Sequence, residues 1–192
     1  MGDEVTFSQM RRMVRLAVWA GFMSLGAWVS IPVGPVPITL QTFFIFLAAF
    51  IEGPSACLAV LLYLGAGFLG LPVFTAGLAG PAVLLGPTAG YALCFPITAA
   101  ICGLARRPLA ARRPPSLPRM IFFGLVGLAV LYLCGALGLV INMGFAFKAA
   151  LAVNVTFLPG DLAKVAGASL VALGLARSGA RLFSKETADR RV

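Results

Sequence analysis

The sequence predicts an all-α integral membrane protein with six transmembrane helices and both termini in the cytoplasm. Of its 192 residues, 60% are hydrophobic and only 11% are charged, whereas soluble domains are about 45–50% apolar and about 25% charged. Charges are also absent from long stretches, because Glu52 is the only charged residue between positions 16 and 105. Pro/Gly clusters interrupt these stretches at intervals near the roughly 20 residues that a helix needs to cross a bilayer. The period-2 alternation of a membrane barrel is missing, so helices are the expected spans.

We expect the spans at 13–31, 38–52, 54–71, 86–105, 120–141 and 157–176. The first has a basic start, as a signal peptide has, but it continues through the bulky residues Trp28 and Val29 without a convincing cleavage site. We therefore expect an uncleaved transmembrane helix. The second is short and follows "IPVGPVP", and the turn "EGPS" separates it from the third. A glycine-rich segment, "GLAGPAVLLGPTAGY", leads into the fourth and is expected to be a packed loop and a helix start.

The fifth span follows the Arg-rich segment 106–119, and the sixth is expected to begin at Pro159 and Gly160. Residues 142–156 are expected to connect these two spans, with at most a short re-entrant or surface piece. The predicted organisation is an N-terminal segment 1–12, a six-helix domain 13–176 and a basic tail 177–192.

The basic residues predict the orientation of these spans. Lys and Arg favour cytoplasmic loops, and a six-span topology places the N-terminal arginines, the 106–119 loop and the C-terminal tail on one side. The net charge of +9 is therefore explained by topology and by anionic lipid headgroups. Nucleic acid is not an expected partner. The expected location is the bacterial inner membrane, crossed several times.

Several kinds of chemistry are excluded by residues that the sequence lacks. It contains no histidine, which removes the usual general base and the commonest metal ligand. It has no phosphate-binding G-x-x-x-x-G-K-[ST] segment. The "PGD" at 159–161 resembles an element of intramembrane aspartyl proteases, but that chemistry needs two carboxylates and Asp161 is the only intramembrane Asp. We expect no catalytic residue, no metal and no cofactor.

Polar side chains gather at the span ends that face away from the cytoplasm. The arginine-rich inner ends contain few other polar groups, so this asymmetry predicts a pocket that opens outward. The residues concerned are Thr39, Gln41, Thr42, Thr75, Thr88, Tyr91 and Asn142.

The stretch "FLPGDLAK" places two opposite charges, Asp161 and Lys164, in an otherwise apolar segment. Charges inside a span are costly and usually mark a function. Residues three apart lie on one helix face, so both side chains can point into one cavity. The alternative is a carboxylate cap at the helix start, neutralised by Lys164. In the same way, Gln41 and Thr39 could be ligand contacts or caps, and Tyr91 a stacking wall or an interfacial anchor.

Four segments appear in the order and spacing of a known family: "PVPITLQTF", "LLYLGAGFLGLPVFTAG", "LLGPTAGY" and "FLPGDLAK". Over residues 13–176 the chain resembles BioY proteins, the biotin-specific substrate-binding (S) components of energy-coupling factor (ECF) transporters. The resemblance implies a six-helix protein that binds biotin near the outer membrane face. It also implies partners, namely a coupling transmembrane subunit and two ATP-binding subunits.

The resemblance implies that Asp161 and Lys164 bind biotin. The expected substrate-binding residues are Asp161, Lys164, Tyr91, Gln41, Thr39 and Gly90. Biotin offers ureido N–H donors, a ureido carbonyl and a carboxylate, which suits an acceptor beside a cation. The chain departs from the family pattern at Leu78 and Ala92, where some relatives carry polar residues, so the resemblance assigns no ligand contact to these two.

Span one contains the small-residue pair Ala17 and Gly21, as well as Ala20 and Ser24. Such pairs permit close helix packing. Packing within the chain is one interpretation. Docking on the coupling subunit, for which S components often use an AxxxA face, is the other, and we carry it over to Ala17 and Gly21.

Two other functions remain as alternatives. A solitary or ion-coupled facilitator could use Asp161 as a titrating group, but a second intramembrane acid is missing. A non-transporting membrane scaffold does not explain why the polar side chains gather on one side of the membrane.

Overall fold

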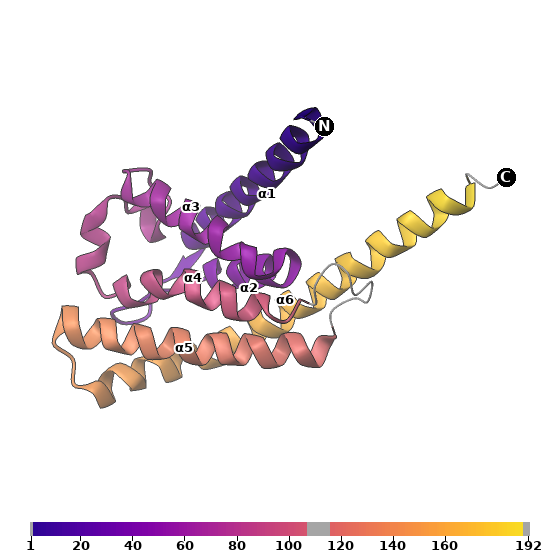
Figure 1. Cartoon of the computed structure of the whole chain (residues 1–192). Coiled ribbons are helices and arrows are strands. Elements are labelled where there is room, and N and C mark those ends of the chain that lie inside the picture. Colours follow the sequence, from indigo (N-terminus) through magenta and orange to yellow (C-terminus); the bar gives the residue numbers. More distant parts are fainter. Residues whose placement is uncertain (1, 107–115, 190–192) are drawn as a thin grey trace.

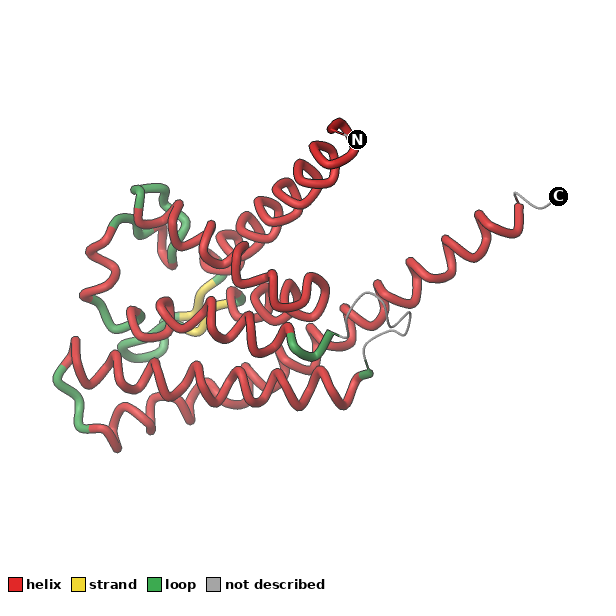
Figure 2. Tube along the Cα trace, viewed as in Figure 1, coloured by secondary structure: helices red, strands yellow, loops and turns green. Residues whose placement is uncertain are grey.

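The computed structural model describes residues 2–106 and 116–189, with side chains for 9–106 and 116–178. Six α-helices make up most of this part (Figures 1 and 2). They are α1 (Gly2–Trp28), α2 (Gln41–Glu52), α3 (Ala56–Phe68), α4 (Ala89–Gly103), α5 (Leu117–Met143) and α6 (Phe147–Asp189). Most of the expected Arg-rich loop, residues 107–115, lies outside the described residues.

Within the described residues, three helical stretches are long and apolar enough to cross a membrane. They are Gln41–Phe68, Leu117–Met143 and Phe147–Ser178, and α4 is a shorter apolar helix. The first stretch combines α2 and α3. Gly53 between them has a φ of 73°, a left-handed conformation that glycine tolerates and a continuing helix does not, so the chain turns there.

A short hairpin precedes α2 and departs from the all-α prediction. Strands β1 (Ser30–Ile31) and β2 (Ile38–Thr39) pair antiparallel, with Ser30 opposite Thr39. Gly34, at the turn, has a φ of 65°, a conformation that L side chains rarely adopt. The "IPVGPVP" segment is therefore a folded element that carries Thr39 back toward the start of α2.

The last helix differs most from the prediction. α6 begins at Phe147 and contains Pro159, so the expectation that Pro159 and Gly160 start a helix with Asp161 in its first turn is wrong. Proline removes the N–H that would bond to the carbonyl of Val155. The helix continues because Pro159 lies on its exposed side, where the ring does not disturb the packed face. Asp161 therefore lies in mid-helix, without support from a helix N-terminus.

Helices α4 and α5 approach each other backbone to backbone. A Cβ added to Gly90 would collide with the Cys134 carbonyl and would lie 2.8 Å from the Cα of Gly138. A Cβ on Gly138 would lie 2.6 Å from the Cα of Gly90. Small residues on facing helices permit such contact in membrane proteins.

At one end of the bundle, Glu52 connects α1 to the end of α2. Its carboxylate accepts a hydrogen bond from Trp19 Nε1 at 3.3 Å and pairs with Arg15 Nε at 3.4 Å. Arg106 donates to the backbone carbonyl of Ile51 nearby. The start of α1 and the end of α6 extend away from the bundle toward this side, whereas the loop between α3 and α4 and the connection between α5 and α6 lie at the other end (Figure 1).

Candidate ligand-binding site

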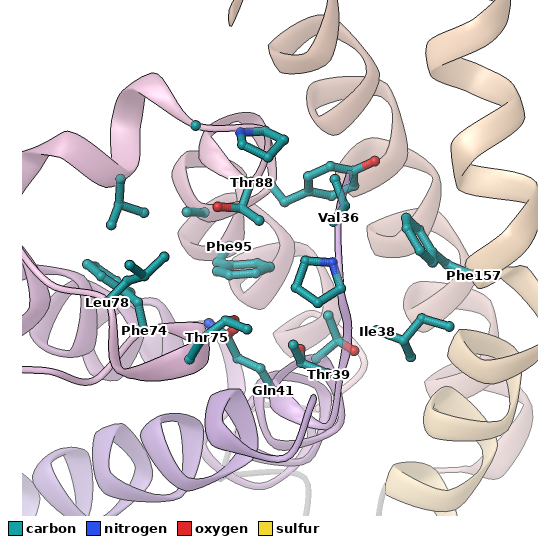
Figure 3. Close-up of a pocket in the computed structure, with 18 of the residues that line it drawn as sticks. Val36, Ile38, Thr39, Gln41, Phe74, Thr75, Leu78, Thr88, Phe95 and Phe157 are labelled. Atoms are coloured by element: carbon teal, nitrogen blue, oxygen red, sulfur yellow. The ribbon is translucent and has the colours of Figure 1, made fainter. Parts of the chain in front are cut away.

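A cavity of about 410 Å³ lies between the hairpin, the loop that joins α3 to α4, and the helices around them. Small-molecule sites in proteins commonly occupy about 300–1,000 Å³. Its walls come from the hairpin and the start of α2 (35–42), Tyr63 of α3, the loop 74–88, and side chains of α4, α5 and α6. Figure 3 shows Thr39, Gln41 and Thr75 grouped on one wall and Phe157 on another.

Most of the lining is apolar. Proline, alanine, valine, leucine, isoleucine and phenylalanine side chains make up the greater part of the wall, and Phe74, Phe95 and Phe157 are buried. The burial of an apolar part of a ligand against such a surface is favourable, because it removes apolar surface from water. A few polar groups then fix the orientation of the ligand.

Asp161 and Lys164 are the charged side chains among the residues that line this cavity. Lys164 Nζ donates to Asp161 Oδ1 at 2.7 Å, and the two side chains are only 14% and 7% exposed. The other carboxylate oxygen, Oδ2, accepts from the Tyr132 hydroxyl at 2.8 Å. Thr42 Oγ1 donates to Oδ1 at 3.3 Å. Groups from α2, α5 and α6 thus hold one buried carboxylate.

This arrangement leaves hydrogen-bonding capacity for a ligand. A carboxylate offers about four lone-pair sites, and three donors reach Asp161, only one of them at Oδ2. The Lys164 ammonium has three N–H donors, one of which is used on Asp161. An acceptor with a free position therefore lies beside a cation with free donors.

A second polar connection lies behind the cavity wall. The Tyr91 hydroxyl of α4 donates to Asn154 Oδ1 of α6 at 2.5 Å. Asn154 Nδ2 donates to the backbone carbonyl of Tyr132 in α5 at 2.9 Å. Tyr91 and Tyr132 line the cavity, whereas Asn154 does not.

The structure brings five of the six expected substrate-binding residues to this cavity. Asp161, Lys164, Tyr91, Gln41 and Thr39 all line it, and Gln41 is only 5% exposed. The Tyr91 hydroxyl is engaged by Asn154, so the ring is what Tyr91 offers to a ligand. Asp161 and Lys164 do form the ion pair of the alternative interpretation, but in mid-helix and facing the cavity.

Gly90 does not line the cavity. Its Cα faces α5, where Gly138 approaches it, so its position fits helix packing. Leu78 and Ala92, which depart from the family pattern, do line the cavity and make its wall apolar at those two points.

Sequence reasoning missed Tyr132, which lines the cavity, and Asn154, which bonds to two residues of its wall. Tyr132 stands in the apolar run "LAVLYLCGAL", where nothing marks it as polar-facing. Asn154 precedes Asp161 by seven residues, about two helical turns. In a continuous helix this spacing predicts that the two side chains lie on the same face. The prediction that residues 142–156 connect two spans hides this signal, because α6 begins at Phe147.

The two small-residue pairs of α1 face different ways. Ala20 is buried and Ser24 is partly buried, whereas Ala17 and Gly21 are exposed, and nothing lies within 4 Å of a Cβ built on Gly21. The Ala17–Gly21 face is therefore exposed, with open space at Gly21.

Apolar helices surrounding a small, mostly apolar cavity define a membrane protein that binds a small molecule. The sequence matches the BioY family over residues 2–181. The biotin transporter BioY of Thermotoga maritima is 38% identical over 170 residues, which cover 86% of this chain and 96% of the relative. The probable biotin transporter BioY of Pyrococcus horikoshii is 38% identical over 158 residues, or 82% and 91% of the two chains.

A crystal structure of the S-component for biotin from an ECF-type ABC transporter has the same fold. It matches with a TM-score of 0.81 and 26% identity, over 88% of this chain and 93% of that chain. The chain belongs to the BioY family.

Proposed function

We propose that this chain is the biotin-binding S component of an ECF transporter and takes up biotin rather than catalysing a reaction. The observation that carries the proposal is the buried Asp161–Lys164 pair, which faces an apolar cavity of small-molecule size. The relatives named as biotin transporters support biotin as the occupant.

The geometry of the pair favours one orientation of biotin. The ligand's carboxylate would be repelled by Asp161, and Asp161 already neutralises Lys164 at 2.7 Å. A ureido ring presents an N–H beside a carbonyl, which matches the free position at Asp161 Oδ2 and the free donors of Lys164. The ureido ring therefore lies at the ion pair, and the apolar walls surround the rest of the ligand.

The proposed partners are a coupling transmembrane subunit and ATP-binding subunits, as the S-component likeness supports. The exposed Ala17–Gly21 face of α1 is the proposed docking surface, because small residues let a partner helix approach closely. The proposed topology has six spans, with both termini and the 106–119 loop on the cytoplasmic side of the cell membrane. The arginine distribution and the common side of the two helix ends support it.

Calorimetric titration of biotin into the purified chain, without partners, tests the binding proposal. Wild type should bind stoichiometrically. Asp161→Asn and Lys164→Met should each weaken binding by roughly 10–100-fold, because each removes a charge-assisted hydrogen bond. Lys148→Ala is the matched control, since Lys148 is an exposed lysine of the same helix, and it should leave the affinity unchanged. A folded wild-type sample that gives no binding heat would overturn biotin as the ligand.

Uptake measurements test the partner proposal. Cells that produce this chain alone should accumulate less biotin than cells that also produce the coupling and ATP-binding subunits. Equal, ATP-independent uptake in both would favour the solitary facilitator instead.

A further inference from the structure

Asn154 is a buried polar residue outside the ligand cavity. It is 3% exposed, and it lies on α6 about two turns before Asp161 on the same face of the helix. A buried amide is costly unless its hydrogen bonds are made. Asn154 makes one bond as an acceptor, from Tyr91 at 2.5 Å, and one as a donor, to the Tyr132 carbonyl at 2.9 Å.

Both bonds end on residues that line the cavity. The bond to the Tyr132 carbonyl joins α6 to α5 at the residue whose hydroxyl reaches Asp161 Oδ2. The bond from Tyr91 turns that hydroxyl away from the ligand and fixes the ring as part of the wall. One amide thus connects α4, α5 and α6 around the carboxylate.

We propose that Asn154 is a positioning residue of the ligand site. It sets where the Tyr132 hydroxyl and the Tyr91 ring stand, and through Tyr132 it sets the direction in which Asp161 presents its free acceptor position. This inference rests on the proposed function, since its test is the affinity for biotin.

Ser169 provides a comparison on the same helix. It is as deeply buried as Asn154, but its hydroxyl donates to the Val165 carbonyl of its own helix at 2.7 Å. A merely structural buried polar group would behave like Ser169. Asn154 differs because its partners are on other helices and belong to the cavity wall.

A double-mutant cycle on biotin affinity tests the proposal. Asn154→Leu removes both bonds and keeps the volume similar, and Tyr132→Phe removes only the hydroxyl that reaches Asp161. Each should weaken biotin binding by about tenfold. The double variant should bind about as weakly as Asn154→Leu alone, because Asn154 acts through Tyr132. Ser169→Ala should keep the wild-type affinity. Affinities are compared on monodisperse, folded samples.

Three outcomes would overturn the inference. The first is wild-type affinity in folded Asn154→Leu. The second is an additive loss in the double variant, which would mean that Asn154 does not act through Tyr132. The third is a loss in Ser169→Ala as large as that in Asn154→Leu, which would reduce the effect to general core damage. If the folded wild-type chain does not bind biotin, the proposed function is overturned instead, and this inference with it.

A second cycle applies if Asn154→Leu does not fold. Tyr91→Phe removes only the hydroxyl that Asn154 accepts, and it is combined with Tyr132→Phe. Losses of affinity that are less than additive support a connection through Asn154. Additive losses, or no loss in Tyr91→Phe, contradict it.

Discussion

The carboxylate of Asp161 is buried, where an unpaired charge has a high desolvation cost. Transferring an ion from water into a low-dielectric interior costs several kcal/mol, and a partner offsets this only with good geometry and further hydrogen bonds. Asp161 has both, since Lys164 lies at 2.7 Å while Tyr132 and Thr42 also donate to it. The pair is close to neutral as seen from the cavity, which favours a neutral polar group as its ligand contact.

Analogues of biotin test the orientation that follows from this. Biotinamide, which lacks the negative charge but keeps the ureido ring, should bind within about tenfold of biotin because its altered end lies away from Asp161. In 2-iminobiotin the carbonyl acceptor becomes a cationic donor, so it should face Lys164 unfavourably and lose affinity by more than about 100-fold. Competition against radiolabelled biotin measures both. The reverse order of affinities would place the carboxylate at the ion pair.

The individual site residues were predictable to different degrees. Asp161 and Lys164 stand out because charges are rare in this chain, and Gln41 and Thr39 because they follow a proline-rich break. Tyr132 was not predictable from its own neighbourhood, since its role depends on a contact with α6 that only packing creates. Gly90 was expected at the ligand, whereas the structure shows that it contacts α5. A glycine looks the same in sequence whether a ligand or a helix needs the space.

At the scale of elements, the α4–α5 crossing depends on the absence of side chains at Gly90 and Gly138. Gly90→Ala should destabilise the chain by about 1–3 kcal/mol, because the added methyl meets backbone, which cannot move aside as a side chain can. Thermal unfolding in detergent measures this.

Gly160→Ala is the matched control for that substitution. Gly160 is also a helical glycine, but a Cβ there has nothing within 4 Å, so stability should be unchanged or higher by up to about 1 kcal/mol. Equal stability of the two variants would contradict the close crossing. If Gly90→Ala has wild-type stability but binds biotin more weakly, the result would support a ligand contact at Gly90.

The helix boundaries show what local sequence could and could not determine. The ends of α2 and α5 lie near the expected boundaries, because the positive-φ glycines Gly53 and Gly144 end these two helices. Pro159 was misleading because a proline on the exposed side of a long helix costs one hydrogen bond without ending the helix. The hairpin at 30–39 was missed because two-residue strands leave no periodic pattern to detect.

For the whole molecule, the fold and the charge distribution predict one orientation in the membrane. In a cysteine-free background, Lys148→Cys at the start of α6 should react with a membrane-impermeant maleimide in intact cells. Ser116→Cys, just before α5, should react only after permeabilisation. Both positions are exposed, so access to the reagent depends on the side of the membrane. The opposite labelling pattern would invert the topology, and labelling of both from outside would contradict the span count.

The cavity is bordered by five helices, α2 to α6. A bound ligand therefore completes the interior of the protein as well as being its cargo. A ligand at 100 times its Kd stabilises the state that binds it by about 2.7 kcal/mol, and shifts of about 1–2 kcal/mol can alter the abundance of a protein in cells severalfold. We therefore expect the chain to be longest-lived in cells that are well supplied with its vitamin and to be degraded faster under starvation. Synthesis would then have to rise merely to keep the number of binding sites constant when the vitamin is scarce.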